Sequence, residues 1–153
     1  MIRLALFQPE IPHNAGALVR LAACLGFHID IIGPCGFLLS EKHFRRAGMD
    51  YVHLADLHYH SSYEEFERSL TEPYRLIAMT AKSGVPYTSF EYKAGDVLIA
   101  GCESAGLPIY ALDKCSYAVT IPMKQPARSI NLALSAGIIS SEALRQLNIQ
   151  AAS

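Results

Sequence analysis

Three stretches that contain or precede glycine and proline follow strand-like segments and carry groups suited to ligand binding. They are residues 79–82 (MTAK), 101–108 (GCESAGLP) and 121–129 (IPMKQPARS). Ligands of open α/β sheets gather outside the carboxyl ends of the strands, so we expect the three stretches to form one site. Gly101 and Gly106 let the backbone approach a ligand or adopt φ > 0. Each stretch alone is also typical of an ordinary turn, and it is their succession after three strands that favours a site.

A fourth stretch, residues 9–16 (PEIPHNAG), is followed by a lone cation. A helix that starts near Asn14 places Arg20 about 1.5 turns further along. Arg20 lies in an otherwise apolar run, ALVRLAA at 17–23, where a cation needs a partner or a site. The alternative is a paired or snorkelling arginine without a functional role.

The elements that must position these residues alternate between strand and helix patterns. Together they predict parallel β-α-β units in a single α/β domain over residues 1–153. Asn14 is a plausible N-cap of the first helix and Gly26 its stop, and Ser62 with Glu65 forms a capping box for the third helix. The predicted strands are 4–7, 28–32, 51–54, 76–80, 97–100 and 117–121, and the predicted helices are 15–25, 41–47, 63–70 and 130–147.

The last of these helices is unusual because residues 130–139 are apolar around most of its circumference. Such a helix should be buried on several sides. Either a homodimer interface or a central position in the core would explain this, and the pattern does not choose between them.

Composition excludes several classes of protein. Of 153 residues, 51% are hydrophobic and 18% charged, which excludes a disordered chain, a coiled coil and a collagen-like fibre. The net charge of −1 means that any nucleic-acid contact uses a local patch. No apolar run reaches the roughly 18 residues of a membrane span. The N-terminal apolar stretch is too short for a signal peptide, so we expect a cytoplasmic protein.

Common cofactor and metal motifs are missing from the sequence. The four cysteines show no C-x-x-C spacing, and His58 and His60 lack a third ligand nearby, so we expect free thiols, surface histidines and no metal site. There is also no G-x-G-x-x-G, P-loop or G-x-S-x-G motif. The expected α/β fold must therefore bind its ligand by another device.

Four motifs together resemble a known family. They are PEIPHNAGxxxR at 9–20, FRRAG at 44–48, GCESAGLP at 101–108, and IPM at 121–123 followed by ARSINL at 127–132. In this order and at these distances they resemble the SPOUT superfamily of RNA methyltransferases, and within it the small TrmL type, which methylates the 2′-hydroxyl of the tRNA wobble nucleotide. The resemblance implies an α/β fold with a C-terminal trefoil knot, an obligate homodimer, tRNA as substrate and S-adenosylmethionine as cofactor.

The same resemblance implies the residues of the site. Glu103 has two possible roles, a hydrogen bond within the pocket or ordering of its loop. The family often has proline where this chain has Cys102, and serine where it has Ala133. The cofactor-binding residues implied are Met79, Gly101, Glu103, Ile121, Ser129 and Asn131.

The implied reaction is methyl transfer from a sulfonium to a ribose oxygen, with Arg20, positioned by Asn14, acting on the hydroxyl. Arginine stays protonated at neutral pH and cannot serve as a general base. We therefore expect Arg20 to stabilise the developing alkoxide or to bind an adjacent phosphate, while phosphate, water or a neighbouring group takes the proton. His13 is one nearby base.

Two basic pairs are candidates for RNA binding, Arg45 with Arg46 and Lys124 with Arg128. Three alternatives stay open at this point: a 2′-O-methyltransferase of another RNA, a non-catalytic RNA-binding knot protein, and a small-molecule α/β enzyme.

Overall fold

Seven parallel strands form the sheet of this protein, whose computed structural model describes residues 1–37 and 52–147. The strand order is β3-β2-β1-β6-β4-β7-β5, which places the early strand β1 beside the late strand β6. The strands are β1 Arg3–Phe7, β2 His28–Ile32, β3 Leu57–His60, β4 Arg75–Met79, β5 Val85–Pro86, β6 Asp96–Ala100 and β7 Tyr117–Thr120.

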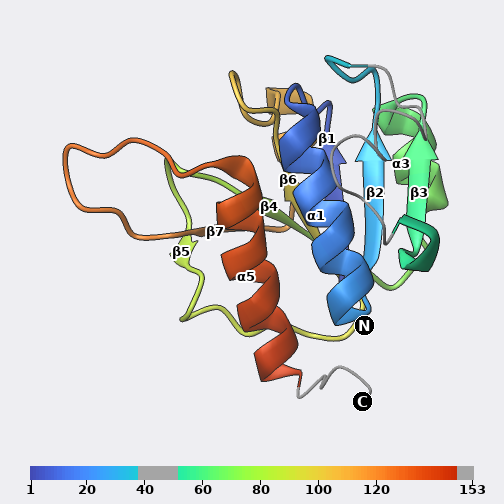
Figure 1. Cartoon of the computed structure of the whole chain (residues 1–153). Helices are drawn as coiled ribbons and strands as arrows, with labels where there is room; N and C mark the ends of the chain where they lie inside the picture. The colour runs from blue at the N-terminus through green and yellow to red at the C-terminus, as the bar shows by residue number, and fades with distance from the viewer. Residues whose placement is uncertain (38–51, 148–153) are drawn as a thin grey trace.

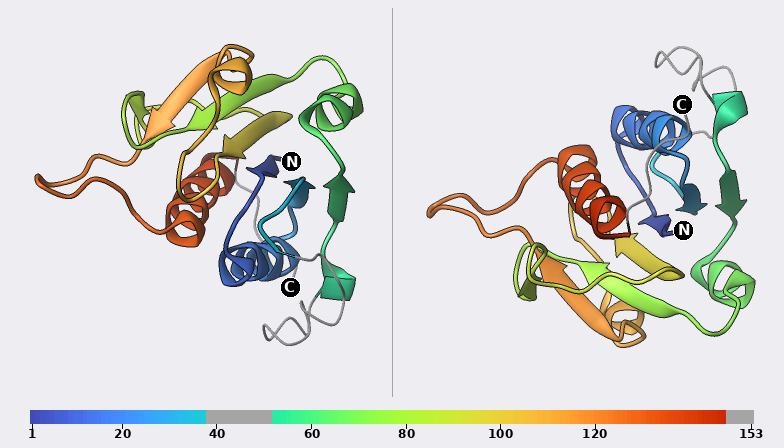
Figure 2. Two further views of the ribbon diagram at one scale, coloured as in Figure 1. Left: turned by 90° about the horizontal axis from the view of Figure 1, so that it is seen from above. Right: turned by 90° about the horizontal axis from the view of Figure 1, so that it is seen from below.

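Helices cover both faces of this sheet. The long helices α1 (Pro12–Leu25) and α5 (Leu132–Gln146) lie side by side on one face, and α3 (Tyr63–Ser69) lies on the other (Figures 1 and 2). The short helix α4 (Ile109–Leu112) belongs to the α3 face, because its buried alanine packs into the same apolar cluster as α3. The result is the three-layer arrangement expected of an α/β protein.

The central strands are apolar along their whole length because they are buried on both faces. In β1, Leu4 and Leu6 pack into the cluster beneath α1 and α5, whereas Ala5 and Phe7 pack into the cluster beneath α3. Alternate residues of a strand point to opposite faces, so a strand covered on both sides shows a continuous apolar run. This confirms the predicted strands at 4–7, 28–32, 76–80, 97–100 and 117–121 to within one residue at either end.

The prediction of a strand at 51–54 is wrong. Val52–Leu54 forms a 3₁₀ helix, and the strand that pairs with β2 is β3, which begins at Leu57. The register between β2 and β3 includes a hydrogen bond from the Ile29 N–H to the carbonyl of Asp56, the residue just before β3. The short elements α4 and β5 were not predicted, because two to four residues carry too little periodicity. The helix predicted at 41–47 lies outside the described residues.

The two long helices begin at positions other than those predicted. Helix α1 begins at Pro12 and has Ile11 as its N-cap, so the prediction that Asn14 caps it is wrong. Proline is favoured at a first helical position, since its missing N–H has no partner there in any case. Helix α5 begins at Leu132, and Asn131 caps it. Gly26 ends α1, as predicted, and has φ 70°.

Only one face of α5 is buried. Ala136, Ile139 and Ala143 are in the core, but Leu134 is 63% exposed and Ile138 is 39% exposed. The prediction of a helix buried on several sides is therefore wrong for the chain taken alone. Its exposed apolar side borders a groove of about 710 Å³ between α1 and α5, lined by Ala17, Leu18, Leu21, Tyr87, Ala133, Leu134, Gly137, Ile138, Ser141, Glu142 and Arg145.

Candidate active site

The stretches singled out in the sequence converge at one edge of the sheet. Strands β1, β6, β4 and β7 are successive neighbours and run parallel, so the segments that follow them leave from the same edge. Three of these segments begin at Gly101 after β6, at Thr80 after β4 and at Ile121 after β7. The fourth, after β1, leads into α1 and Asn14. The structure thus places the four segments at one edge of the sheet, and the single ligand site expected there stays a prediction.

Glu103 connects the segment after β6 to the start of α1. Its carboxylate accepts hydrogen bonds from the backbone N–H groups of Glu10 (2.7 Å) and Ile11 (3.0 Å) and from Asn14 Nδ2 (3.0 Å). In return, the Glu10 carboxylate accepts from the Ser104 N–H (2.8 Å) and hydroxyl (2.7 Å). Of the two roles left open for Glu103, the structure shows the ordering of its loop. The reciprocal Glu10–Ser104 pair was missed, because nothing local in the sequence links residues so far apart.

The charge of Glu103 is stabilised by these bonds. Burial alone raises the pKa of this carboxyl, but the donors at Glu10 and Asn14 outweigh it and hold the pKa below its usual value. A lowered pKa in the folded state contributes stability above the unfolded-state value of about 4.3, and this contribution is lost as the pH falls through the folded-state pKa.

We therefore expect Glu103→Gln to lower the free energy of unfolding by about 1–2 kcal/mol at neutral pH, because it replaces charge-assisted hydrogen bonds. The difference between wild type and variant should shrink as the pH falls below about 5. Urea unfolding across this pH range measures it. Glu91→Gln, at an 84% exposed side chain, is the matched control and should change little. A difference that grew at acid pH would contradict the role given to Glu103.

Asn14 extends this connection to the last helix. It is buried, 6% exposed, and its Oδ1 accepts a hydrogen bond from Asn131 Nδ2 at 2.9 Å. Asn131 Oδ1 in turn accepts from the N–H groups of Ala133 and Leu134 and so caps α5. The chain of contacts from Glu103 through Asn14 to Asn131 ties together the segments that follow β1, β6 and β7. The side chain of Asn131, predicted to bind cofactor, is engaged in this connection.

Gly101 lies where its loop closes on itself. A Cβ placed at Gly101 would lie 2.1 Å from the carbonyl carbon of Gly106 and 2.2 Å from the backbone nitrogen of Leu107. Gly106 has φ 72° and donates its N–H to the Cys102 carbonyl at 3.0 Å. The thiol of Cys102, which replaces the family's frequent proline, lies 3.5 Å from the Gly106 carbonyl oxygen. The loop is thus a tight turn that only glycine at 101 permits.

The remaining candidate cofactor residues differ in their surroundings. Met79 and Ile121 are half-buried against the core, at the ends of the neighbouring strands β4 and β7. Ser129 is exposed, on the segment 121–131 that connects β7 to α5. This segment, orange in Figures 1 and 2, projects away from the sheet. Lys124 and Arg128 are exposed on the same segment.

Arg20 is exposed on α1, six residues after Asn14 and therefore about 9 Å further along the helix axis. It lies one turn after Ala17, which lines the groove between α1 and α5. His13 is exposed in the first turn of α1. Arg45 and Arg46, the other pair predicted to bind RNA, lie outside the described residues.

The model of the SpoU rRNA methylase family matches residues 1–141 of this chain. The chain belongs to the SpoU methylase family. A relative from Beijerinckia indica named tRNA (cytidine(34)-2′-O)-methyltransferase is 44% identical to this SpoU methylase over 145 residues, which cover 94% of this chain and 91% of the relative. The protein of the same name from Escherichia coli K12 is 38% identical, with 96% of this chain and 94% of the relative covered.

Solved structures agree with this family membership. One that concerns the 2-OH methylation of C/U34 on tRNA has a TM-score of 0.91 and 41% identity to this SpoU methylase, with 98% of each chain covered. An AdoMet-bound rRNA methyltransferase from Sinorhizobium meliloti has a TM-score of 0.85 and 30% identity over 95% of this chain and 56% of that one. They confirm the predicted α/β fold with a parallel sheet. The trefoil knot stays a prediction.

The residues at the edge of the sheet suit S-adenosylmethionine, which is bound in that relative. Half-buried Met79 and Ile121 offer apolar surface for a flat ring, and the backbone at Gly101 follows the neighbouring strand β6, whose last residue pairs with Met79. Sites for such ligands are largely apolar with a few well-placed polar groups.

Proposed function

We propose that this protein is an S-adenosylmethionine-dependent tRNA methyltransferase that methylates the ribose 2′-hydroxyl of nucleotide 34, a cytidine or a modified uridine. The observation that carries the proposal is the agreement, over 98% of both chains, with the structure concerned with methylation of C/U34 on tRNA. Relatives named for this activity match over nearly the full chain. The connection between Glu103, Asn14 and Asn131 supplies an ordered edge on which the reaction can occur.

S-adenosylmethionine supplies a methyl group on a sulfonium that leaves as a neutral thioether. Gly101 and the half-buried Met79 and Ile121 would hold the cofactor at the ends of β6, β4 and β7, with Ser129 contributing from the segment before α5. The main requirement for this transfer is that donor and acceptor be held in position, and the hydrogen-bonded loops would supply that order. Arg20 would stabilise the negative charge that develops on the 2′-oxygen, while phosphate, water or a neighbouring group takes the hydroxyl proton.

The RNA is held by local positive charge, because the chain as a whole carries a net charge of −1. Lys124 and Arg128 are exposed on the projecting segment 121–131, where phosphate groups can reach them. Phosphate contacts of this kind position an RNA without reading its bases. Arg45 and Arg46 are the second proposed pair.

We also infer that the protein acts as a homodimer, formed through the apolar face of α5. Leu134 and Ile138 are exposed side by side, one turn apart, and border the groove along α1. An exposed apolar patch rimmed by polar groups, here Glu142 and Arg145, is typical of an interface. A second copy seated there would also lie close to Arg20.

Leu134→Glu is expected to convert the dimer to a monomer, because it places a charge in the centre of the apolar interface. Sedimentation velocity at micromolar concentration measures the change. Ile109→Glu, at a 76% exposed residue on the opposite face of the sheet, is the control and should leave the dimer intact. A wild-type protein that sediments as a monomer would contradict the proposed interface.

The proposed reaction is tested by methyl transfer from labelled S-adenosylmethionine to total tRNA that lacks wobble-ribose methylation, followed by nucleoside mapping. A 2′-O-methyl group at position 34 is the expected result. A methyl group elsewhere would retain the reaction and replace the substrate. Cofactor binding without methylation of any RNA would favour a binding-only protein.

Among the described helices, none has the length and apolarity needed to cross a membrane. A tRNA substrate is consistent with action in the cytoplasm, which we propose as the location of the enzyme.

A further inference from the structure

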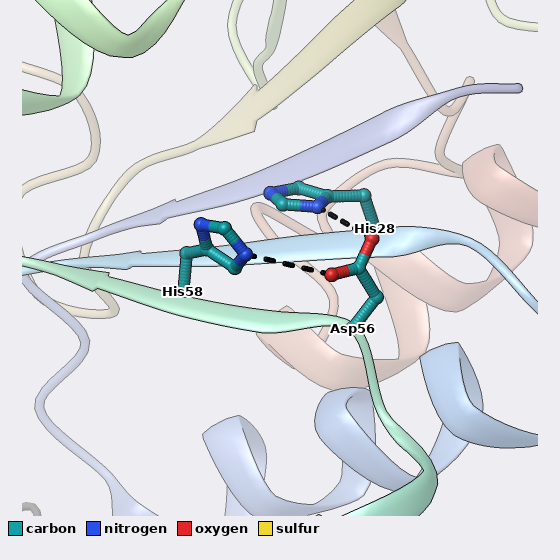
Figure 3. A group of neighbouring side chains, drawn as sticks. All are labelled: His28, Asp56 and His58. Atoms are coloured by element: carbon teal, nitrogen blue, oxygen red, sulfur yellow. Dashed lines mark hydrogen bonds and ion pairs between the residues drawn. The ribbon is translucent and has the colours of Figure 1, made fainter.

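Three side chains at the start of β2 and β3 form a cluster of metal-ligand type outside the active site. His28 Nδ1 lies 2.9 Å from Asp56 Oδ2, and His58 Nε2 lies 3.5 Å from Asp56 Oδ1 (Figure 3). One ligand atom from each residue falls within 4.8 Å of the others. The rings of His28 and His58 meet edge to face, with centroids 4.7 Å apart.

Strand pairing brings the three residues together from two distant segments. In the parallel pair β2–β3, Ile29 lies opposite Leu57 and Asp30 opposite His58, which puts Asp56 beside His28. Because side chains alternate along a strand, His28 and His58 project from the same face of the sheet. The expectation of a surface histidine holds for His58 and is wrong for His60. His60 is only 5% exposed and bonds Asp30 at 2.6 Å, while His58 is exposed and finds its partners at 28 and 56.

A buried carboxylate supports the ring of His28 from behind. His28 Nε2, on the side away from Asp56, lies 3.2 Å from Asp30 Oδ1, and Asp30 is fully buried. A histidine that ligates a metal through one nitrogen commonly has a carboxylate at the other, which orients the ring and raises its basicity as a ligand. Asp30 is itself held by Arg3, whose guanidinium donates to both carboxylate oxygens. The imidazole of His28, with a side chain 17% exposed, is therefore held in place with Nδ1 turned toward Asp56.

We propose that His28, Asp56 and His58 form a binding site for a zinc ion. Two imidazole nitrogens and one carboxylate oxygen are ligands that Zn²⁺ prefers, with water completing the tetrahedron. Zinc–nitrogen distances of about 2.0–2.1 Å require ligand atoms about 3.3 Å apart. The two histidine nitrogens lie 2.9 Å and 3.5 Å from the Asp56 carboxylate oxygens, which is close to this value. The side chains of Asp56 and His58 are 65% and 59% exposed, so they can turn to admit the ion without movement of the backbone.

The site would join the edge strand β3 to β2 at the end of the sheet opposite the active site. His28 is the first residue of β2, whereas the active-site segments follow the last residues of their strands. An edge strand has a partner on one side only, so a metal cross-link there adds stability that pairing alone does not supply. The ion is accordingly assigned to the fold of this region and takes no part in methyl transfer.

The test is titration of the full-length protein with Zn²⁺ in competition with a chromophoric chelator. We expect one ion per chain in the wild type. His58→Ala and Asp56→Asn should each weaken binding at least about 10- to 100-fold, as loss of a ligand or its support does. His53→Ala, at an exposed histidine in the 3₁₀ helix, is the matched control and should bind like wild type.

A second readout separates this site from the four free thiols. Zn²⁺ should raise the melting temperature of the wild type and of His53→Ala but not of His58→Ala, with unchanged circular dichroism showing that each variant is folded. Equal zinc affinity in the wild type and His58→Ala would overturn the proposal. A sulfur-to-metal charge-transfer band in the Co²⁺-loaded protein would do the same, because it would place the ion at a cysteine.

Discussion

Arg20→Ala is expected to lose methyl transfer by roughly 10²- to 10³-fold in kcat while S-adenosylmethionine binds as in the wild type. The reason is the separation of roles along α1. Three residues proposed to hold the cofactor, Met79, Gly101 and Ile121, lie at the ends of the strands, whereas Arg20 is exposed about 9 Å beyond Asn14 along the helix. A cation assigned to the 2′-oxygen stabilises charge that exists only in the transition state, so its removal lowers kcat rather than cofactor affinity.

Single-turnover methylation and calorimetry measure the two effects separately. Arg20→Lys should restore part of the rate, because a charge is retained without the planar guanidinium. Arg68→Ala removes an exposed arginine from α3 on the other face of the sheet and serves as the control. If Arg20→Ala abolished cofactor binding, the assignment of Arg20 to the RNA oxygen would be wrong.

Gly101→Ala is expected to abolish cofactor binding and to lower the free energy of unfolding by about 1–3 kcal/mol, the usual cost of overpacking. The added Cβ would lie 2.1 Å from a backbone atom of Gly106 and 2.2 Å from one of Leu107, neither of which is a flexible side chain. The loop 101–108 must therefore open. Opening the loop would break the hydrogen bond between Asn14 and Glu103 and disorder the edge proposed to bind the cofactor.

Calorimetric titration with S-adenosylmethionine and thermal unfolding give the two readouts for Gly101→Ala. The matched control is Gly26→Ala, where φ is +70° but no atom lies within 4 Å of an added Cβ. That variant should lose stability through backbone strain while binding cofactor normally, since Gly26 ends α1 far from the active-site edge. Normal cofactor affinity in Gly101→Ala would show that the closed loop is not needed.

Much of the fold could be predicted because local patterns report burial. The continuous apolar runs of β1 and β6 indicated interior strands, and Gly26 and Ser62 marked helix ends through their own backbone or hydroxyl chemistry. The positions of the site segments followed from the rule that parallel strands share a carboxyl edge. The short elements β3, β5 and α4 were not predicted, because two to four residues carry too little periodicity to reveal them.

The sequence by itself determined the α/β class, the segments that meet at the candidate active site and, through four motifs, the methyltransferase family. Only the tertiary structure decided which side chains meet. Glu103 accepts hydrogen bonds from the start of α1 because β6 lies beside β1. His28 lies next to Asp56 and His58 because β2 pairs with β3 in one particular register. Sheet order and register depend on the packing of the whole chain, and contacts between residues so far apart leave no periodic trace in the sequence.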